Sequence, residues 1–416
     1  MSPASAASID DELLSDRFVE DPYPTYARLR AEDPVHWSDA WAAWVVSRYA
    51  DVQSVLLADG VAYSTRGRIA AAIASFTTEQ QAALQELRNH YSVGLLHSDP
   101  PDHTRQRALV NKVFNPRVVD RMRPTIGAIV EELLDRAAAR GDSTDLIADF
   151  AFPLPAAVVA DVLGIPREDQ LQVKIWAERL NAFLGSNRAS FEIVLDSQAS
   201  LHAMREYLTE IAAERLATPR DDVISRLAAA VGKPDGMTHD ELLSTSVTML
   251  VGGHVTTTAL ISNALLTLWR NPDQLADVRA DEHRIVGAVE ETLRFESPNQ
   301  RLIRVATRPT ELAGRTIRVG DPMMLLIGSA NRDEAQFDAA GDFVSTRQPN
   351  RHLAFAVGEH FCIGASLARA EATIALGALL RRFPTLRVDD RAPRWTRSPT
   401  LRVMRELQVE LVAPPA

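Results

Sequence analysis

Apolar residues recur at three- and four-residue spacing over most of the chain, which is the period of an amphipathic helix. The pattern predicts helices over residues 24–32, 49–57, 102–113, 116–140, 167–183, 191–217, 239–269, 284–295 and 365–382. Short apolar runs predict strands over residues 35–37, 43–46, 302–306, 316–319, 323–327 and 407–411. Residues 60–101 are weakly patterned, as a lid or binding loop often is. The sequence therefore predicts a mainly α fold with small β-sheets, a large helical part beside a small β-rich lobe.

No internal repeat and no long linker divides the 416 residues, so we expect a single domain over residues 1–416. Residues 1–20 lack a basic start and an apolar run, which predicts a flexible N-terminal segment instead of a signal peptide or an anchor. Residues 242–269 carry no Asp, Glu, Lys or Arg and are long enough to span a bilayer. Polar residues and Gly252–Gly253 interrupt this run, which favours a buried central helix and no membrane contact.

The charge balance excludes one class of partner. With 45 basic and 55 acidic residues the net charge is −10, and no run of Lys or Arg is longer than Arg381–Arg382. Because nucleic-acid binding needs clustered cations, we expect no nucleic-acid partner. The single cysteine, Cys362, cannot form an internal disulfide, which fits a reducing compartment and predicts a cytoplasmic protein.

The segment around this cysteine is the strongest chemical signal. Phe355, Gly358, Cys362 and Gly364 lie in FAVGEHFCIG, directly before the helix predicted from residue 365. Glycines on both sides of the cysteine permit backbone to approach a flat ligand closely. A thiolate before a helix start is stabilised by backbone N–H groups, and such a thiolate can ligate haem iron. The alternative is a structural cysteine buried in the core.

Two further pairs share helical faces. Glu291 and Arg294, at i and i+3, are usually a surface pair, but with residues 350–352 (NRH) they read as a buried network that fixes the cysteine loop. His103 and Arg107, at i and i+4, are placed to grip an anion such as a haem propionate. Arg304 and His360 complete that clamp, and the alternative for all four is an exposed basic residue.

The central helix contains Gly252, Gly253, Val255, Thr256 and Thr257. Mid-helix glycines cost stability, and a threonine hydroxyl can bond back to the carbonyl four residues earlier and bend the helix. Thr256 facing Gly252 opens a small groove that holds a hydroxyl and suits a diatomic ligand on iron. Packing of small residues between helices is the alternative.

In combination and order, these residues resemble the cytochrome P-450 superfamily in its soluble bacterial form. The resemblance covers nearly the whole chain, and residues 21–24 (DPYP), 99–105 (DPPDHTR) and 331–333 (NRD) add to it. It implies haem b with Cys362 as its thiolate ligand, and His103, Arg107, Arg304 and His360 on the propionates. It also implies Thr256 beside bound dioxygen, with Gly252, Gly253 and Thr257 near it.

Two positions depart from the family pattern: Ala356 replaces a glycine, and Val255 replaces the acid that usually precedes the threonine. The resemblance implies a monooxygenase that oxidises a small organic molecule, here of secondary metabolism. Without the acid, protons must come through Thr256, Thr257, His254 and water, or from the substrate. The alternatives are oxidative C–C or C–N coupling or cyclisation without oxygen insertion, and a non-catalytic haem-binding recruitment protein.

The chain has no flavin or nicotinamide motif and no second cysteine, so electrons must come from NAD(P)H through a ferredoxin reductase and a ferredoxin. Arg105, Arg347 and Arg351 are expected in the basic surface that meets the ferredoxin. The expected substrate-pocket residues are Leu96, Met249, Asn299, Leu302 and Leu401. Residues 299–301 (NQR) make one wall polar, although adjacent residues of an extended segment cannot all face one cavity. A polar, peptide-like or aromatic natural product is the expected substrate.

Overall fold

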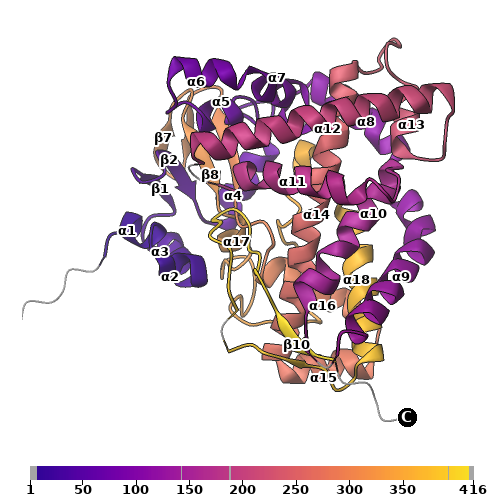
Figure 1. The fold of residues 1–416 in the computed structure, drawn as a ribbon. Coiled ribbons are helices and arrows are strands. Elements are labelled where there is room, and N and C mark those ends of the chain that lie inside the picture. The colour runs from indigo at the N-terminus through magenta and orange to yellow at the C-terminus, as the bar shows by residue number, and fades with distance from the viewer. Residues whose placement is uncertain (1–6, 142, 187–188, 392, 412–416) are drawn as a thin grey trace, which may run out of the picture.

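Helices dominate the fold (Figure 1). The computed structural model describes residues 7–141, 143–186, 189–391 and 393–411. Five predicted helices have the expected bounds: α4 (Tyr49–Leu57), α8 (Asp102–Val113), α12 (Phe191–Ala217), α16 (Arg284–Phe295) and α18 (Ala365–Arg382). Four differ by a few residues at their ends: α3 (Tyr23–Glu32), α9 (Pro116–Ala138), α11 (Gln170–Leu184) and α14 (His239–Arg270). The predicted mainly helical fold with small sheets is confirmed.

The strands form small sheets, as predicted. The largest has the order β1 (Val35–Ser38), β2 (Ala43–Val46), β8 (Pro322–Leu325), β5 (Leu302–Ala306), β3 (Tyr63–Ser64). Strands β2 and β8 are parallel, with Trp44 opposite Met323, and the other neighbours are antiparallel. A second sheet joins β4 (Ser143–Asp145), β10 (Gln408–Glu410) and β9 (Arg387–Val388), and a third joins β6 (Thr310–Leu312) and β7 (Arg315–Ile317). The strand predicted to reach residue 327 stops at Leu325, because α17 (Ile327–Ala330) begins there.

Residues 60–101 are not the long loop that the weak pattern predicts. They fold into α5 (Arg68–Ala72), α6 (Thr78–Ala83), α7 (Gln85–Val93) and the 3₁₀ helix η1 (Leu95–His97). A capping box between Thr77 and Gln80 starts α6, and Leu87 and Tyr91 bury one face of α7. The pattern missed these helices because each is short and presents at most two apolar residues to the core.

The N-terminal segment is another correction. Residues 7–20, expected to be flexible, contain α1 (Ile9–Leu13) and α2 (Asp16–Glu20), each started by a serine cap. Ile9, Leu13 and Phe18 are buried against α3 and stabilise the segment through apolar contact. Residues 1–6 of the expected flexible segment lie outside the described residues.

Further helices escaped the periodicity analysis: η2 (Ile147–Ala151, a π-helix), α10 (Pro153–Leu163), α13 (Val223–Ala228) and α15 (Pro272–Ala280). Helix α10 is apolar nearly all round, and Leu154, Val158 and Val159 are among its buried side chains. A helix enclosed by neighbours on every side has no polar face, so its sequence shows no amphipathic period.

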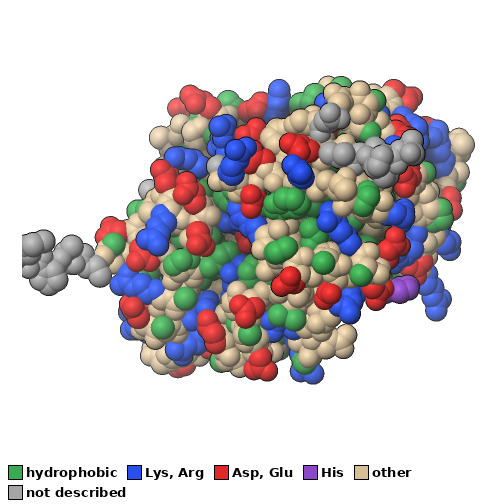
Figure 2. All heavy atoms as spheres, turned by 90° about the horizontal axis from the view of Figure 1, so that it is seen from below, with side chains coloured by type: hydrophobic (Ala, Val, Ile, Leu, Met, Phe, Trp, Pro, Cys, Tyr) green, Lys and Arg blue, Asp and Glu red, His purple; other side chains and the backbone are tan. Residues whose placement is uncertain are grey.

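Helix α14 is the centre of the helical part, as predicted for the uncharged run. It packs against α10, α16 and α18 (Figure 1). Among the described residues it is the one helix long and apolar enough to cross a membrane, but 78% of its most apolar window is buried inside the protein. On the face seen in Figure 2, basic and acidic side chains are interspersed, so this face gathers no charge of one sign. Because α14 contacts both α16 and α18, it lies beside elements that carry or adjoin other candidate site residues.

Candidate active site

Cys362 lies in a tight loop immediately before α18. Its backbone N–H donates to the carbonyl of Phe355 at 2.9 Å, which closes the loop, and Gly358 begins the 3₁₀ helix η3 (Gly358–His360) with φ +76°. A Cβ at Gly358 would stand 3.0 Å from the carbonyl oxygen of Leu56, so only glycine fits there without strain. Ala356 adopts φ +56°, a left-handed conformation that costs an L-residue about 1–2 kcal/mol. Ala356, which stands where the family pattern has glycine, therefore carries a conformational cost that glycine would not.

The thiol of Cys362 is open to a ligand although protein surrounds it. The residue is exposed, yet burial in its wider surroundings raises the pKa of the thiol. Backbone N–H groups of Gly364 and Ala365 and the nearby Arg107 and Arg369 oppose that rise. An exposed side chain with a desolvated thiol borders an internal space instead of the outer surface. This location is not that of a structural cysteine packed in the core.

Helix α14 has an opening in its middle turn. Gly252 is exposed although most of the helix is buried, and a Cβ built there would meet nothing within 4 Å. The Thr256 hydroxyl donates to the Gly252 carbonyl at 2.9 Å, which is the back-bond that the sequence predicts. Thr257, in contrast, is only 3% exposed, and a Cβ at Gly253 would touch Val159. Gly252 and Thr256 therefore border open space, whereas Gly253 and Thr257 face packed protein.

His254 does not suit the proton route considered for it. Its side chain is buried, its ring packs 4.0 Å from the ring of Phe152, and its Nε2 lies 3.2 Å from the Phe152 carbonyl oxygen. Burial lowers the pKa of His254 to about 4, and the cation of Lys174 contributes to this. The imidazole is therefore neutral at pH 7 and faces η2 and α10, away from the opening at Gly252.

Two histidines from different segments come together near the thiol loop. The rings of His103 (α8) and His360 (η3) lie 4.3 Å apart between centroids. Nδ1 of His103 lies 3.3 Å from a Glu359 carboxylate oxygen without hydrogen-bond geometry, and Nε2 of both rings is buried with no partner among the described residues. Burial, together with the cations around it, lowers the pKa of His360 to about 3. Buried nitrogens are almost always hydrogen-bonded, so these unpartnered atoms indicate a ligand from outside the chain.

The two arginines of the expected clamp differ. Arg107 lies near Cys362 and Glu359, and burial lowers the pKa of its guanidinium. Arg304 is already committed, because its Nε and Nη2 donate to the buried carboxylate of Asp59 at 2.6 and 2.8 Å. Its remaining Nη1 donates to the Ile303 carbonyl. No pattern in the sequence pointed to Asp59, which lies 245 residues earlier in the chain than Arg304.

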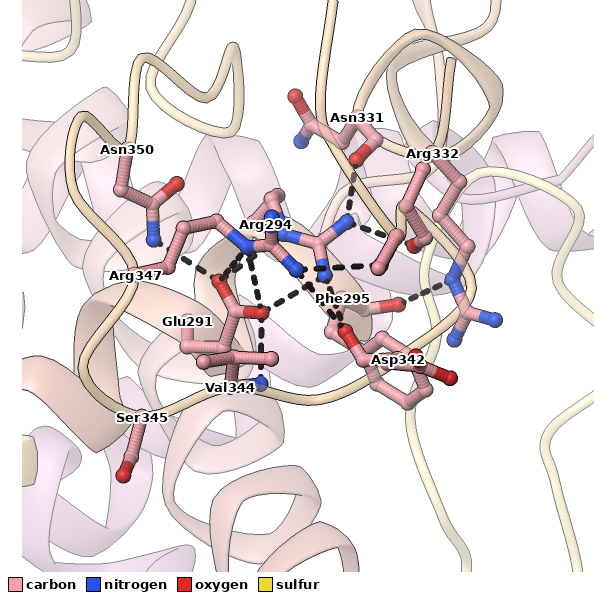
Figure 3. A network of polar contacts seen from close by, with 12 residues as sticks. Glu291, Arg294, Phe295, Asn331, Arg332, Asp342, Val344, Ser345, Arg347 and Asn350 are labelled. Carbon is pink, nitrogen blue, oxygen red and sulfur yellow. Dashed lines mark hydrogen bonds and ion pairs between the residues drawn. The ribbon is translucent and has the colours of Figure 1, made fainter. Parts of the chain in front are cut away.

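Glu291 and Arg294 form the buried network that the sequence predicts (Figure 3). Both side chains are 0% exposed and make two hydrogen bonds to each other, at 2.7 and 2.9 Å. Arg294 also donates to the carbonyls of residues 331, 340 and 342. Glu291 accepts from the Val344 amide, Arg347 and Asn350. One turn of α16 thus binds the segment of residues 331–350, which leads into the thiol loop, at several positions.

Several side chains expected in this network or on the ferredoxin-binding surface lie elsewhere. Arg351 is exposed and His352 does not contact Glu291. Arg347, expected on a ferredoxin-binding surface, is half-buried and its guanidinium pairs with Glu291. Arg105, expected on the same surface, pairs with the buried carboxylate of Glu241. Of the three arginines named for that surface, only Arg351 is free of such pairing and exposed.

A second carboxylate on α16, Glu290, was missed altogether. It accepts from Arg369 of α18 at 2.6 and 2.9 Å, and His352 lies at 3.2 Å. The Ala354 amide donates to Nδ1 of His352, so the ring donates to Glu290 through Nε2. The guanidinium of Arg369 in turn lies 4.6 Å from the ring centroid of Phe355. Glu290 therefore connects α16 to the start of α18 and to the thiol loop.

Replacing Glu290 by glutamine is expected to cost about 1–3 kcal/mol of unfolding free energy at pH 7, since the three hydrogen bonds from Arg369 and His352 lose their anionic acceptor. Burial raises the pKa of Glu290, but the bonds from His352 and Arg369 outweigh it and lower the pKa to about 2. The folded pKa lies below the unfolded value, so this stability is present above the unfolded pKa and is lost as the pH falls toward 2. Urea unfolding of both proteins from about pH 7 to about pH 3 should show a shrinking difference. Glu282→Gln, at an exposed position, serves as the control, and a difference independent of pH would contradict the assignment.

The expected substrate residues occupy several elements. Leu96 of η1 is 42% exposed, whereas Met249 of α14 is 9% exposed. Asn299 and Leu401 form a β-bridge to each other, and Leu302 begins β5. Gln300 points away from any shared wall, because its side chain bonds Tyr26 and the carbonyl of residue 297. As expected, the three polar residues 299–301 do not all face one cavity.

Comparison with known proteins decides the family. The family model described as Cytochrome P-450 matches residues 42–410, a range that contains the thiol loop, the opening of α14 and the Glu291–Arg294 pair. The chain belongs to the cytochrome P-450 family. This cytochrome P-450 is therefore an oxidoreductase of the monooxygenase type, and haem is the cofactor of its family.

Its relatives are bacterial. Cytochrome P-450 107B1 of Saccharopolyspora erythraea is 39% identical over 95% of this chain and 96% of its own. Cytochrome P-450 monooxygenase PikC of Streptomyces venezuelae is 36% identical over 98% of this chain and 95% of its own. The crystal structure of P450BioI in complex with an acyl carrier protein ligated to hexadec-9Z-enoic acid superposes with a TM-score of 0.88. That chain is 34% identical, and the match covers 95% of this cytochrome P-450 and 100% of P450BioI.

The residues present fit a haem. The open thiol of Cys362 is a soft donor of the kind that ligates haem iron. The unpartnered Nε2 atoms of His103 and His360 and the nearby guanidinium of Arg107 are the donors that a carboxylate requires. At Gly252 an added Cβ would meet nothing within 4 Å, so the backbone there borders open space. Of the expected contacts, Arg304 alone must share its hydrogens with an internal acid.

Proposed function

We propose that this cytochrome P-450 holds haem b through Cys362 and inserts one oxygen atom into a small organic molecule of secondary metabolism. One observation carries the proposal: the only thiol of the chain and the Gly252–Thr256 opening are both exposed from otherwise buried surroundings, on elements that pack together. The haem supplies, when bound, the reductive activation of dioxygen.

The chain's own residues bind and orient the cofactor. Cys362 offers its sulfur, and the amides of Gly364 and Ala365 stabilise the thiolate by donating hydrogen bonds. His103, His360 and Arg107 hold carboxylates, and such bonds satisfy nitrogens that are otherwise buried without partners. The guanidinium of Arg304 already binds the Asp59 carboxylate, so Arg304 contributes to carboxylate binding mainly through this pair. The buried pair Glu291–Arg294 keeps the thiol loop in place.

Thr256 is the polar group on the distal side. Its hydrogen is donated to the Gly252 carbonyl, so its oxygen presents only lone pairs to the opening. In this orientation the hydroxyl accepts a hydrogen bond from an O–H group and orients it. Protons therefore reach the site through water or substrate, because Val255 carries no acid and His254 is turned away.

The absence of an acid at Val255 supports a second candidate, oxidative C–C or C–N coupling or cyclisation. Such a reaction removes two hydrogens from the substrate and needs no oxygen insertion. Turnover with ferredoxin, ferredoxin reductase, NAD(P)H and isotopically labelled dioxygen separates the two. One labelled oxygen atom in the product supports the monooxygenase, and an unlabelled, dehydrogenated product supports coupling. Haem-loaded protein that consumes no NAD(P)H with any ligand would support the recruitment protein instead.

Restoring an acid at this position, by Val255→Asp, is expected to raise the fraction of NAD(P)H electrons recovered in oxygenated product about tenfold, with less peroxide released. The reason is that a carboxyl group next to Thr256 can hold and deliver a proton that water alone delivers slowly. Product, peroxide and NAD(P)H are measured together for wild type, Val255→Asp and the isosteric, non-acidic Val255→Asn. Unchanged coupling in the aspartate variant would show that the position is irrelevant.

The electron donor is proposed to be a ferredoxin with its reductase, in the cytoplasm. Sequence supports this because the chain carries one cysteine and no flavin or nicotinamide motif. Arg351 is the one arginine of the three originally expected at that surface that stays exposed.

A further inference from the structure

A cavity of about 180 Å³ lies between α5, α7 and η1. Its polar lining consists of donors or amphoteric groups, among them Arg68, Arg88, Asn89, Tyr91, Ser92 and His97, and no Asp or Glu lines it. No acidic residue of the described chain forms an ion pair with either arginine. The cavity therefore concentrates positive charge and hydrogen-bond donors without a counter-charge from the described protein.

Several of these groups are buried and unsatisfied. The Nε of Arg68, the hydroxyl of Tyr91 and Nδ1 of His97 have no hydrogen-bond partner among the described residues. Tyr91 is 5% and His97 4% exposed, so bulk water does not solvate them. Buried polar atoms of native proteins are almost always paired, and three orphans around one cavity indicate a missing ligand.

The charges around the cavity point to an anion. Burial lowers the pKa of Arg68 to about 10, and the nearby cation of Arg304 contributes. Arg301, also buried, has an unpartnered Nη1, and burial and the neighbouring Arg68 lower its pKa to about 10. Two buried guanidiniums that repel each other are stabilised most by a negative charge placed between or beside them.

We propose that this cavity binds the carboxylate of an amphipathic monocarboxylic acid, which makes such acids the substrate class of the enzyme. Arg68 and Arg88 supply the charge, and the Tyr91 hydroxyl and Nδ1 of His97 donate further hydrogen bonds to the carboxylate. The inference rests on the proposed function and deepens it. Gly67, Ile69 and Ala70 are the apolar part of the lining, so one small charged group fits the cavity better than a polyanion.

The position of the cavity suits a substrate headgroup. Helix α7 and η1 both pack against α14, the helix that carries the Gly252 opening. Leu96, exposed on η1, directly precedes His97 and offers an apolar surface for the hydrocarbon part of the acid. A carboxylate has two possible sources here, the substrate and a haem propionate, and the experiment must separate them. Arg88, on α7, is the arginine that distinguishes them, since no contact links it to His103, His360 or Arg304.

The test compares dodecanoate with dodecanamide, which has the same chain and no charge, on the haem-loaded enzyme. Isothermal titration calorimetry and the substrate-induced spectral shift give both affinities. Dodecanoate is expected to bind at least tenfold more tightly than dodecanamide. Arg88→Gln removes this preference and leaves dodecanamide binding unchanged, whereas Arg88→Lys retains most of it. Arg123→Gln, an exposed arginine of α9, is the matched control and changes neither affinity.

Arg68→Gln separates the two sources. A normal haem content with a lost preference for dodecanoate supports the substrate site. A lost haem content, together with an intact acid preference in Arg88→Gln, assigns the cavity to the cofactor and overturns the proposal. Equal affinity for acid and amide, or no dodecanoate binding, in protein that shows the thiolate-specific carbon monoxide spectrum overturns it as well. Absence of that spectrum in the wild type refutes the proposed function instead.

Discussion

Cys362→Ser is expected to abolish the thiolate-specific absorption of the carbon monoxide complex completely. The chain has no other cysteine, so no second sulfur can take over. A serine hydroxyl is not deprotonated at neutral pH in the way that a thiol near backbone N–H groups is. The loop itself should persist, because its closing bond from residue 362 to the Phe355 carbonyl is made by backbone. The measurement is the difference spectrum of reduced protein with and without carbon monoxide.

The control for this variant is Ile363→Val, which changes the neighbouring side chain and keeps the sulfur. Circular dichroism of both variants should match the wild type, which shows that loss of the absorption is a loss of ligation and not of folding. An unaltered carbon monoxide spectrum in Cys362→Ser would mean that the metal is held by another residue, and the assignment of the site would fail.

Arg294→Met is expected to lower the unfolding free energy by about 3–5 kcal/mol, because it leaves the carboxylate of Glu291 buried without its main counter-charge. Three backbone carbonyls that Arg294 now satisfies would also lose their donor. The thiol loop depends on this region, so haem content should fall in parallel. Urea unfolding, followed together with haem absorption, measures both effects.

Two comparisons sharpen this result. Arg284→Gln lies on the same helix and breaks an exposed pair with Asp277, which should change stability by less than about 0.5 kcal/mol. The double variant Glu291→Leu with Arg294→Met removes both charges and should be less destabilised than Arg294→Met alone. A loss below about 1 kcal/mol in Arg294→Met would contradict the role assigned to the pair.

The sequence predicts best those elements that have one buried and one solvated face. Helices such as α12 and α16 show this pattern, and their bounds were predicted to the residue. Helix α10 has no solvated face and therefore no readable period, and α7, with 9 residues, is too short for its period to be recognised. The pattern along the chain records a repeated period, and it does not report elements in which that period is absent or extends over too few residues.

The candidate site shows the same division. Cys362, Glu291 and Arg294 were predicted because their chemistry depends on close sequence spacing. Asp59 and Glu290 were missed because their partners, Arg304 and Arg369, lie 245 and 79 residues away. A contact between distant segments is set by the tertiary fold, and a single sequence does not display it. The unpartnered nitrogens of the two histidines likewise became visible only when burial was known.

Glu290 and Glu291 are consecutive, yet they face different parts of the molecule. Glu290 binds Arg369 on the helix that follows the thiol loop, and Glu291 binds the coil that leads into that loop. A slip of α16 by a single residue would break both contacts together and release the sulfur from either side. This turn of α16 therefore positions both sides of the thiol loop. Insertions or deletions within it should be far more damaging than insertions or deletions in a neighbouring helix of equal burial.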